Sequence, residues 1–229
     1  KILNIIIIIT VFTALSYFLV HAAEDNLNIS LTWQSSTSAP DEYQGRSLPT
    51  RSSTLTVFAL IAKHDPNNLI FDWYLDRNYM KYASGQGRDT FSFVITEWHG
   101  YDHTVRVKIS NKDESVSGYA SITIDVHEPK VYIFLENNFN KEYSLKPGSE
   151  QTFTSIPYFF NTYSMDSLQY KWYFNNREVE NTGALSRPDK FSLKINSGSK
   201  AMRKKLGILI TNPNNLIERA VREIKVFIK

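Results

Sequence analysis

Hydrophobic and polar residues alternate with a period of two along many short stretches of this chain. Residues 27–33 (LNISLTW) begin the series, and similar alternation recurs at residues 91–95, 105–109, 191–195 and 224–228. Successive side chains of a strand point to opposite faces of the sheet, so this period is typical of half-buried β-strands. Clusters of Gly, Pro, Asn, Asp and Ser separate the stretches at intervals of roughly 8–12 residues, which predicts an antiparallel β-sandwich.

Some stretches depart from this alternation. Residues 55–62 (LTVFALIA) are continuously apolar and predict a strand, whereas residues 34–53, rich in Ser, Thr and Pro, predict a long loop. Pro157 interrupts a predicted strand and therefore indicates a sheet edge or a bulge. Residues 213–222 are the one stretch compatible with a brief helical turn.

The same pattern occurs twice, about a hundred residues apart. Three landmarks recur in one order: FDWYLDRN at 71–78 and YKWYFNNR at 170–177, DTFSFVI at 89–95 and DKFSLKI at 189–195, and VKISN at 107–111 and ILITN at 208–212. Repetition in a fixed order predicts two copies of one all-β domain, at residues 24–127 and 128–229. The predicted core residues are Trp73, Phe91, Phe93, Trp172 and Phe191.

The residues around the two tryptophans carry a resemblance to known domains. Residues 172–179 (WYFNNREV) resemble the hairpin of immunoglobulin-like domains, and the aromatic-x-Trp pattern is similar to the third strand of PKD domains. The chain departs from both families, because it lacks the acidic, glycine-rich PKD turn and has no Cys pair. The resemblance spans residues 27–229 as a pattern and is specific around the two Trp hairpins. It implies two tandem antiparallel Ig/PKD-like β-sandwiches of an exported bacterial envelope protein.

The N-terminal segment has a different character. Lys1 precedes an uncharged apolar run at residues 5–20, and residues 20–22 (VHA) are compatible with signal-peptidase cleavage before Ala23. The run also approaches the roughly 17–25 residues that span a bilayer. Residues 1–22 are therefore predicted to be an N-terminal hydrophobic helix, either a signal peptide or a membrane anchor through residues 2–20. Both alternatives place the two domains outside the cytoplasm.

The amino-acid composition excludes some kinds of site and limits the expected partners. None of the 229 residues is Cys, which rules out a disulfide framework and a thiolate nucleophile. Residues 24–127 carry 9 basic and 13 acidic side chains (net −4), whereas residues 128–229 carry 16 and 10 (net +6). Opposite charges on the two domains favour head-to-tail contact between separate molecules of this protein. Ordinary solvated faces explain the same net charges. Nucleic acid is not an expected partner of a protein outside the cytoplasm.

Few residues suggest a catalytic or metal site. His99 and His103 lie four apart beside Glu97, but strand geometry would separate them by about 13 Å, so a polar loop is predicted there. The Ser-x-x-Lys spacing at residues 197–200 falls in a predicted hairpin loop, and the glycines at 85–87 fall in a predicted turn. No catalytic residue, metal ligand or cofactor is predicted.

Two groups of side chains are candidates for binding. Lys200, Arg203, Lys204 and Lys205 form the densest basic cluster, which suits either an anionic partner or a strand edge protected from pairing. The aromatic residues between 158 and 163 are candidates for stacking on sugar rings, although alternation predicts that most of them pack inward.

The sequence therefore predicts a non-catalytic extracytoplasmic protein that works in surface adhesion, in protein–protein interaction or as a structural spacer through tandem Ig-like domains. Its predicted partner is another envelope or surface protein, or a second copy of itself. A carbohydrate-binding module of the cell envelope and a pilin-like filament subunit remain as alternatives.

Overall fold

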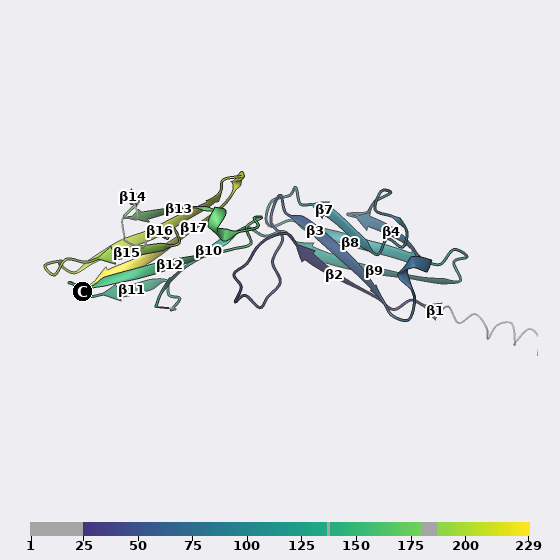
Figure 1. Ribbon diagram of the computed structural model, residues 1–229, viewed down its shortest axis with the longest axis horizontal. Helices are drawn as coiled ribbons and strands as arrows, with labels where there is room; N and C mark the ends of the chain where they lie inside the picture. Colours follow the sequence, from purple (N-terminus) through teal and green to yellow (C-terminus); the bar gives the residue numbers. More distant parts are fainter. Residues whose placement is uncertain (1–24, 137, 180–186) are drawn as a thin grey trace, which may run out of the picture. The chain divides into compact units, whose positions relative to one another are not determined.

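The computed structural model describes residues 25–136, 138–179 and 187–229. The predicted N-terminal helix at residues 1–22 lies outside these ranges, and the choice between signal peptide and anchor stays a prediction. Strands make up most of the described chain (Figure 1). Within the described ranges, no helix has the length and apolar character needed to cross a membrane.

The first copy of the repeat is built from short strands joined by turns. Its elements are β1 (Asp25–Asn26), β2 (Ile29–Ser35), β3 (Thr54–Ile61), the 3-10 helix η1 (Pro66–Asn68), β4 (Ile70–Leu75), β5 (Asn78–Tyr79), β6 (Gly85–Gln86), β7 (Thr90–Val94), β8 (Asp102–Ser110) and β9 (Val116–Asp125).

The second copy follows the same plan with longer final strands. Its elements are β10 (Lys130–Leu135), β11 (Glu142–Leu145), β12 (Glu150–Tyr158), the 3-10 helix η2 (Met165–Ser167), β13 (Gln169–Phe174), β14 (Arg177–Val179), β15 (Lys190–Lys194), β16 (Met202–Asn212) and β17 (Asn215–Ile228).

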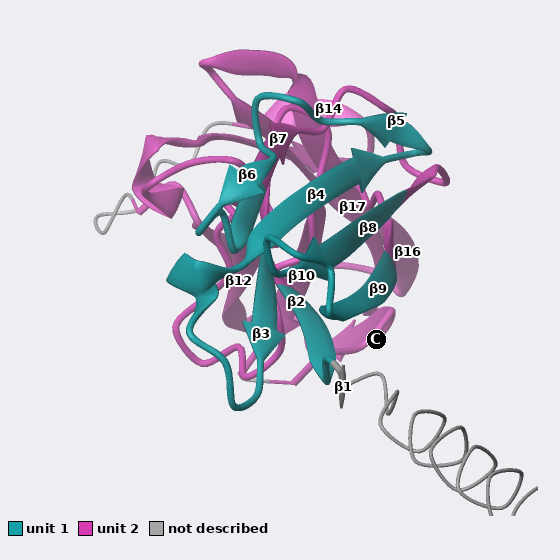
Figure 2. Ribbon diagram, turned by 90° about the vertical axis from the view of Figure 1, so that its right-hand side faces the viewer, with its two compact units in different colours: residues 1–32, 57–91, 104–122 teal, residues 33–56, 92–103, 123–229 magenta. Residues whose placement is uncertain are grey.

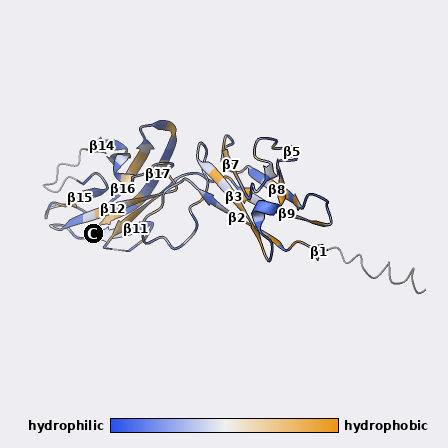
Figure 3. Ribbon diagram, turned by 45° about the vertical axis from the view of Figure 1, so that its right-hand side comes forward, coloured by the Kyte–Doolittle hydropathy of each residue, from blue (hydrophilic) through white to orange (hydrophobic). Residues whose placement is uncertain are grey.

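Each copy contributes two sheets. The first has the orders β2-β3-β7 and β1-β9-β8-β4-β5, with β6 beside β4; the second has β10-β12-β15 and β11-β17-β16-β13-β14. The pairs β1–β9 and β11–β17 are parallel, whereas β4–β8, β10–β12 and β16–β17 are antiparallel. Hydrophobic and hydrophilic positions alternate along the strands (Figure 3). This architecture confirms the predicted all-β fold of two tandem Ig-like sandwiches.

The chain divides into two compact units (Figure 2). Unit 1 consists of Lys1–Thr32, Val57–Phe91 and Thr104–Ile122, and unit 2 of Trp33–Thr56, Ser92–His103 and Thr123–Lys229. Strands of the first copy run through both units, so these units do not coincide with the sequence repeat. The predicted domain boundary between residues 127 and 128 stays a prediction.

A tryptophan occupies the same position in both copies. Trp73 is fully buried, donates a hydrogen bond from Nε1 to the Arg88 carbonyl oxygen at 2.8 Å, and has its ring 5.7 Å from that of Phe91. Trp172 is buried as well. Its Nε1 donates to the Pro188 carbonyl oxygen at 3.1 Å, and its ring lies 5.4 Å from that of Phe191.

These contacts join the two sheets of each copy, because each Trp and its Phe partner belong to different sheets. The Trp hydrogen bonds satisfy the buried indole N–H groups. Phe93 differs from the other predicted core residues, since it is only partly buried and meets the His103 ring edge-on at 5.2 Å.

The two copies also share a tight hairpin turn after the tryptophan. In the first copy Asp76 and Arg77 have φ angles of 49° and 72°, and in the second Asn175 and Asn176 have 50° and 63°. Two consecutive positive φ angles in a two-residue loop define a type I′ turn. The Asp76 carboxylate accepts from the Thr104 N–H at 2.9 Å, and Asn175 Oδ1 accepts from the Lys205 N–H at 3.1 Å.

Two local predictions from the sequence are wrong. Residues 215–222 form part of the strand β17 rather than a helical turn, because each of residues 219–222 pairs with a residue of β16. The loop at residues 197–200 is not a hairpin loop, since β15 and β16 belong to different sheets and the loop crosses from one sheet to the other.

Replacing Arg77 by Gly is expected to raise the free energy of unfolding by about 1 kcal/mol, because a side chain with a Cβ is strained in the left-handed region. The matched control is Asn176→Gly, at the same turn position of the second copy, where Asn already tolerates that conformation and the gain is expected to be smaller. Urea unfolding of both variants measures the difference. A larger gain at Asn176 than at Arg77 contradicts the expectation.

Candidate functional site

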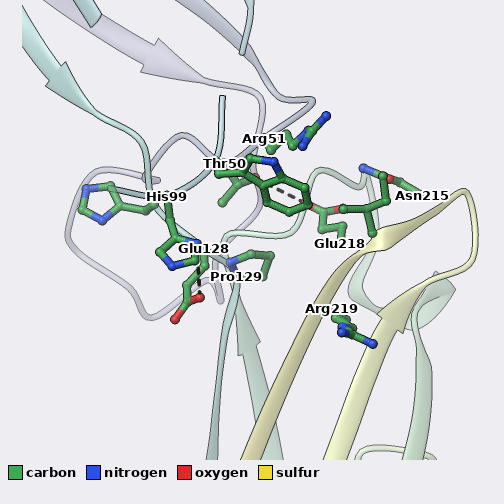
Figure 4. A pocket seen from close by; sticks show the side chains of 11 residues that line it. Thr50, Arg51, His99, Glu128, Pro129, Asn215, Glu218 and Arg219 are labelled. Carbon is green, nitrogen blue, oxygen red and sulfur yellow. Dashed lines mark hydrogen bonds and ion pairs between the residues drawn. The ribbon is translucent and has the colours of Figure 1, made fainter. Parts of the chain in front are cut away.

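Unit 2 contains a cavity of about 260 Å³ (Figure 4). Its walls come from the connection before β3, the connection between β7 and β8, the segment before β10, and the start of β17. The lining residues are Thr50, Arg51, Trp98, His99, His127, Glu128, Pro129, Asn215, Ile217, Glu218 and Arg219. We call this site the Trp98 cavity.

A buried carboxylate forms one wall of the cavity. Glu218 is almost completely buried, and its Oε1 accepts from the Asn161 N–H at 2.6 Å and from the Thr50 hydroxyl at 3.3 Å. Its Oε2 accepts from the Asn212 side-chain amide at 2.7 Å. Burying a charge is costly unless hydrogen bonds compensate for the lost water. These three donors therefore explain how Glu218 occupies an inward-facing position of β17.

Backbone hydrogen bonds hold the segment that carries Thr50. The Ser38 N–H donates to the Phe160 carbonyl oxygen at 2.8 Å, and the Phe159 N–H donates back to the Ser38 carbonyl oxygen at 2.7 Å. The Asn161 side-chain amide donates to the Ser52 carbonyl oxygen at 2.8 Å. The predicted loop at residues 34–53 is thus fastened at several points, which fixes the position of the Thr50 hydroxyl.

Trp98 lies in a turn that projects it into the cavity wall. The Tyr101 N–H donates to the Trp98 carbonyl oxygen at 3.3 Å, and Gly100 has a φ of 90°, which the turn requires. The Gly100 N–H also donates to the Val126 carbonyl oxygen at 3.2 Å. Arg51 stacks on the indole with its Cζ 4.1 Å from the ring centre, and 51% of Trp98 is exposed. The turn and the stacked guanidinium hold an exposed aromatic surface in place.

Two histidines also line the cavity. His99 Nδ1 lies 3.7 Å from Glu128 Oε2, and both side chains are exposed (Figure 4). Burial lowers the pKa of His127 below the usual 6.5, and the charge of Lys130 lowers it further, whereas Asp125 acts in the opposite direction. Burial and the charge of Lys130 both favour the neutral form of the His127 ring, which offers one donor and one acceptor nitrogen.

His99 and His103, four residues apart in the sequence, have different surroundings in the structure. His99 faces Glu128, whereas His103 is buried in β8 with its Nε2 2.8 Å from Glu97 Oε2. Burial raises the pKa of Glu97, but hydrogen bonds from Thr96 outweigh this effect and the net shift is downward. Among the described residues, no three His, Cys, Asp or Glu side chains gather closely enough to hold a metal ion.

The basic cluster is divided between two faces of β16. Arg203 and Lys205 are exposed, where Arg203 stacks on Phe227 at 4.9 Å and Lys205 Nζ lies 2.9 Å from Glu223 Oε1. Lys204 alternates with them and is partly buried, and Lys200 is exposed in the preceding loop. The four cations therefore do not form one continuous surface, although they lie close together in sequence.

The predicted aromatic group at residues 158–163 mostly packs inward. Phe159 and Phe160 are buried, and Tyr158 is partly buried against the Tyr43 ring at 5.7 Å. Tyr163 alone among these aromatics is fully exposed. These side chains therefore stabilise the attachment of the loop at residues 34–53 and offer one free ring.

Unit 1 exposes a different group of aromatic side chains. On β4, β5, β8 and β9, several side chains face away from the buried Trp73, Val107 and Ile109. The outward set includes three tyrosines and three charged residues: Tyr74, Tyr79, Tyr119, Asp72, Arg106 and Lys108. We call this set the tyrosine surface. Its strands are neighbours in the order β9-β8-β4-β5.

Sequence reasoning missed the Trp98 cavity and the tyrosine surface. Trp98 carried one local signal, since a large aromatic residue two positions before Gly100 in a polar connection has no strand face to occupy. Glu218 carried none, because burial of a carboxylate depends on Thr50 and Asn161, which are distant in the sequence.

The strand order, the two facing sheets of each copy and the buried tryptophans define this chain as a pair of tandem Ig-like β-sandwiches. No protein-family model matches the sequence, and a comparison with curated proteins finds no match.

Solved structures show low-identity likenesses. The three N-terminal domains of the bacteriophage RB49 Highly Immunogenic Outer Capsid protein are 11% identical, with a TM-score of 0.48, and the match covers 88% of this chain and 59% of that one. The tandem Ig repeats of Dlar are 10% identical, with a TM-score of 0.30 and coverage of 88% and 97%. The Bacteroides ovatus SGBP-B, solved with a mixed-linkage heptasaccharide, is 10% identical, with a TM-score of 0.27 and coverage of 86% and 47%.

Replacing Glu218 by Gln is expected to lower the free energy of unfolding by about 1–3 kcal/mol, because one carboxylate acceptor becomes a donor that faces another N–H group. Glu223→Gln is the matched control on the same strand. Glu223 is exposed and pairs with Lys205, so its replacement is expected to cost less than about 1 kcal/mol. Urea unfolding compares the two variants, and equal losses contradict the buried-carboxylate account.

The free energy of unfolding is expected to fall as the pH drops below 6.5, because the unfolded chain takes up a proton that folded His127 resists. A depressed folded pKa means that this contribution is intact above the unfolded value and is lost as the pH falls through the folded value. Urea unfolding across this range measures the slope. His127→Gln is expected to remove this part of the slope and Lys130→Gln to reduce it; a slope unchanged in His127→Gln contradicts the prediction.

Proposed function

We propose that this chain is a non-catalytic binding protein that works outside the cytoplasm and contacts another protein through the tyrosine surface of unit 1. The observation that carries the proposal is a set of exposed rings on neighbouring strands: 51% of Tyr79 and 68% of Tyr119 are exposed. Tyrosine is enriched at the centres of protein interfaces because it offers a large apolar area together with a polar hydroxyl.

Contacts within the surface hold the Tyr74 and Tyr79 rings in place. The Tyr79 ring lies 5.4 Å from that of Tyr74, and the Tyr79 hydroxyl donates to Asp72 Oδ1 at 3.2 Å. On the neighbouring strand, Arg106 pairs with Tyr74 in register and Lys108 pairs with Asp72. Rings that are already ordered lose little conformational entropy on binding, which favours a protein contact.

The extracytoplasmic location rests on the sequence pattern of residues 1–22, with its apolar run after a basic residue. A purely structural spacer is the competing function from the same fold. The binding function and the spacer function differ in what they require of the tyrosine surface. A spacer tolerates any substitution there that leaves the protein folded and soluble.

Site-specific photo-crosslinking in the cells that make the full chain tests the proposal. A benzophenone amino acid at position 119 or 79 is expected to give a defined protein adduct. Position 60 is the matched control, because Leu60 is 56% exposed on β3 in the same unit but belongs to the other sheet. With the crosslinker at position 79, Tyr119→Ala is expected to lower the yield about tenfold, the effect of losing an interface anchor.

Equal adduct yields from positions 60 and 119 would indicate non-specific proximity and contradict the proposal. A chain that gives no adduct from either tyrosine position, yet retains its fold by circular dichroism, favours the spacer instead.

A further inference from the structure

The Trp98 cavity combines an aromatic wall with side chains that still have hydrogen-bonding capacity. Within the described ranges, the side chains of His127, Asn215 and Arg219 make no hydrogen bond or ion pair with another residue, although all three line the cavity. They come from two segments of unit 2: Asn215 and Arg219 flank Glu218 along β17 (Figure 4), and His127 lies in the segment before β10. The cavity therefore presents unused polar groups next to the exposed indole of Trp98.

These groups include both donors and acceptors. Arg219 only donates, whereas the Asn215 amide donates and accepts. The neutral His127 ring also does both, and Glu128 adds a carboxylate acceptor. A ligand that matches such a mixed set must itself carry groups that donate and accept, which is the property of hydroxyl groups.

The charges around the cavity balance. Arg51 and Arg219 supply two positive charges, and Glu128 and Glu218 supply two negative charges. An anionic ligand would meet both carboxylates, and a cationic ligand would meet both guanidiniums, so the lining favours a neutral ligand. The stacked Arg51 covers part of Trp98 and positions the indole, while half of the Trp98 surface remains exposed.

The volume limits the size of the ligand. Pockets for drug-sized molecules occupy roughly 300–1,000 Å³, and this cavity, at about 260 Å³, lies just below that range. A single six-membered ring with its substituents suits this space better than an extended chain.

We infer that the Trp98 cavity binds one neutral pyranose ring, which stacks its apolar face on Trp98 and exchanges hydrogen bonds with Asn215, His127 and Arg219. Stacking on an aromatic ring suits a sugar because the C–H groups of one pyranose face are apolar while the hydroxyl groups lie around its edge. This site lies in unit 2 and does not depend on the protein contact proposed for unit 1.

Saturation-transfer NMR on the full chain tests this inference with five probes. Three are neutral, the methyl glycosides of glucose, galactose and mannose, and two are charged, glucuronate and glucosamine. At least one neutral glycoside is expected to bind with a Kd of about 1 mM, the range for a ligand of one ring. Both charged sugars are expected to bind more weakly than that glycoside.

Substitutions locate the binding. Trp98→Ala is expected to weaken binding roughly tenfold or more, and Trp98→Phe less, because Phe keeps a smaller ring. Tyr82→Ala is the matched control, since Tyr82 is 93% exposed and lies in unit 1. If Trp98→Ala fails to fold, Asn215→Ala replaces it, with an expected loss of about tenfold.

Three results would overturn the inference. The first is that none of the three neutral glycosides binds. The second is that glucuronate or glucosamine binds at least as tightly as the neutral sugars. The third is that the folded Trp98→Ala or Asn215→Ala variant keeps an unchanged affinity. If photo-crosslinking gives a protein adduct at the tyrosine surface while any of these three NMR results is obtained, the inference fails but the proposed function stands.

Discussion

Each sandwich depends on a tryptophan that is both packed and hydrogen-bonded between two sheets. The indole ring fills the centre of the core, and its N–H reaches a backbone carbonyl just before the strand that carries the partner Phe: Arg88 in the first copy and Pro188 in the second. One side chain thus sets the separation of the sheets and the position of the facing strand. A ring of another size would leave a void, and a ring without the N–H would leave a buried carbonyl without its donor.

Equivalent backbone contacts surround this centre in the two copies. The Ile95 N–H donates to the Ser53 carbonyl oxygen at 2.9 Å, and the Ile195 N–H donates to the Ser149 carbonyl oxygen at the same distance. Ser52, with a φ of 71°, stands where the second copy has Gly148, with a φ of 79°. The copies therefore share these backbone contacts while their side chains differ.

The Trp98 cavity and the tyrosine surface show this divergence. Tyr79 lies just after the shared type I′ turn and contacts the Tyr74 ring, whereas the second copy has Glu178 at this position, paired with Lys171. The Trp98 turn lies beyond the shared strand β7 and belongs to a connection with its own conformation. A fold of two similar sandwiches thus carries two different kinds of surface: an aromatic sheet face, and a cavity lined by an indole together with polar side chains.

The sequence by itself determined the strands, the twofold repeat and the burial of Trp73 and Trp172, because a period of two and the spacing of turn residues are local properties. Pro157 illustrates the limit. The sequence predicted a sheet edge or a bulge. In the structure β12 pairs with β15 only over residues 150–154, and only the register shows which side of Pro157 is open. The strand at residues 215–222, the division of the basic cluster between two faces and the burial of Glu218 were decided by the tertiary structure. Each depends on pairing with β16 or on hydrogen-bond donors far away in the chain, and no local pattern encodes partners that only folding brings together.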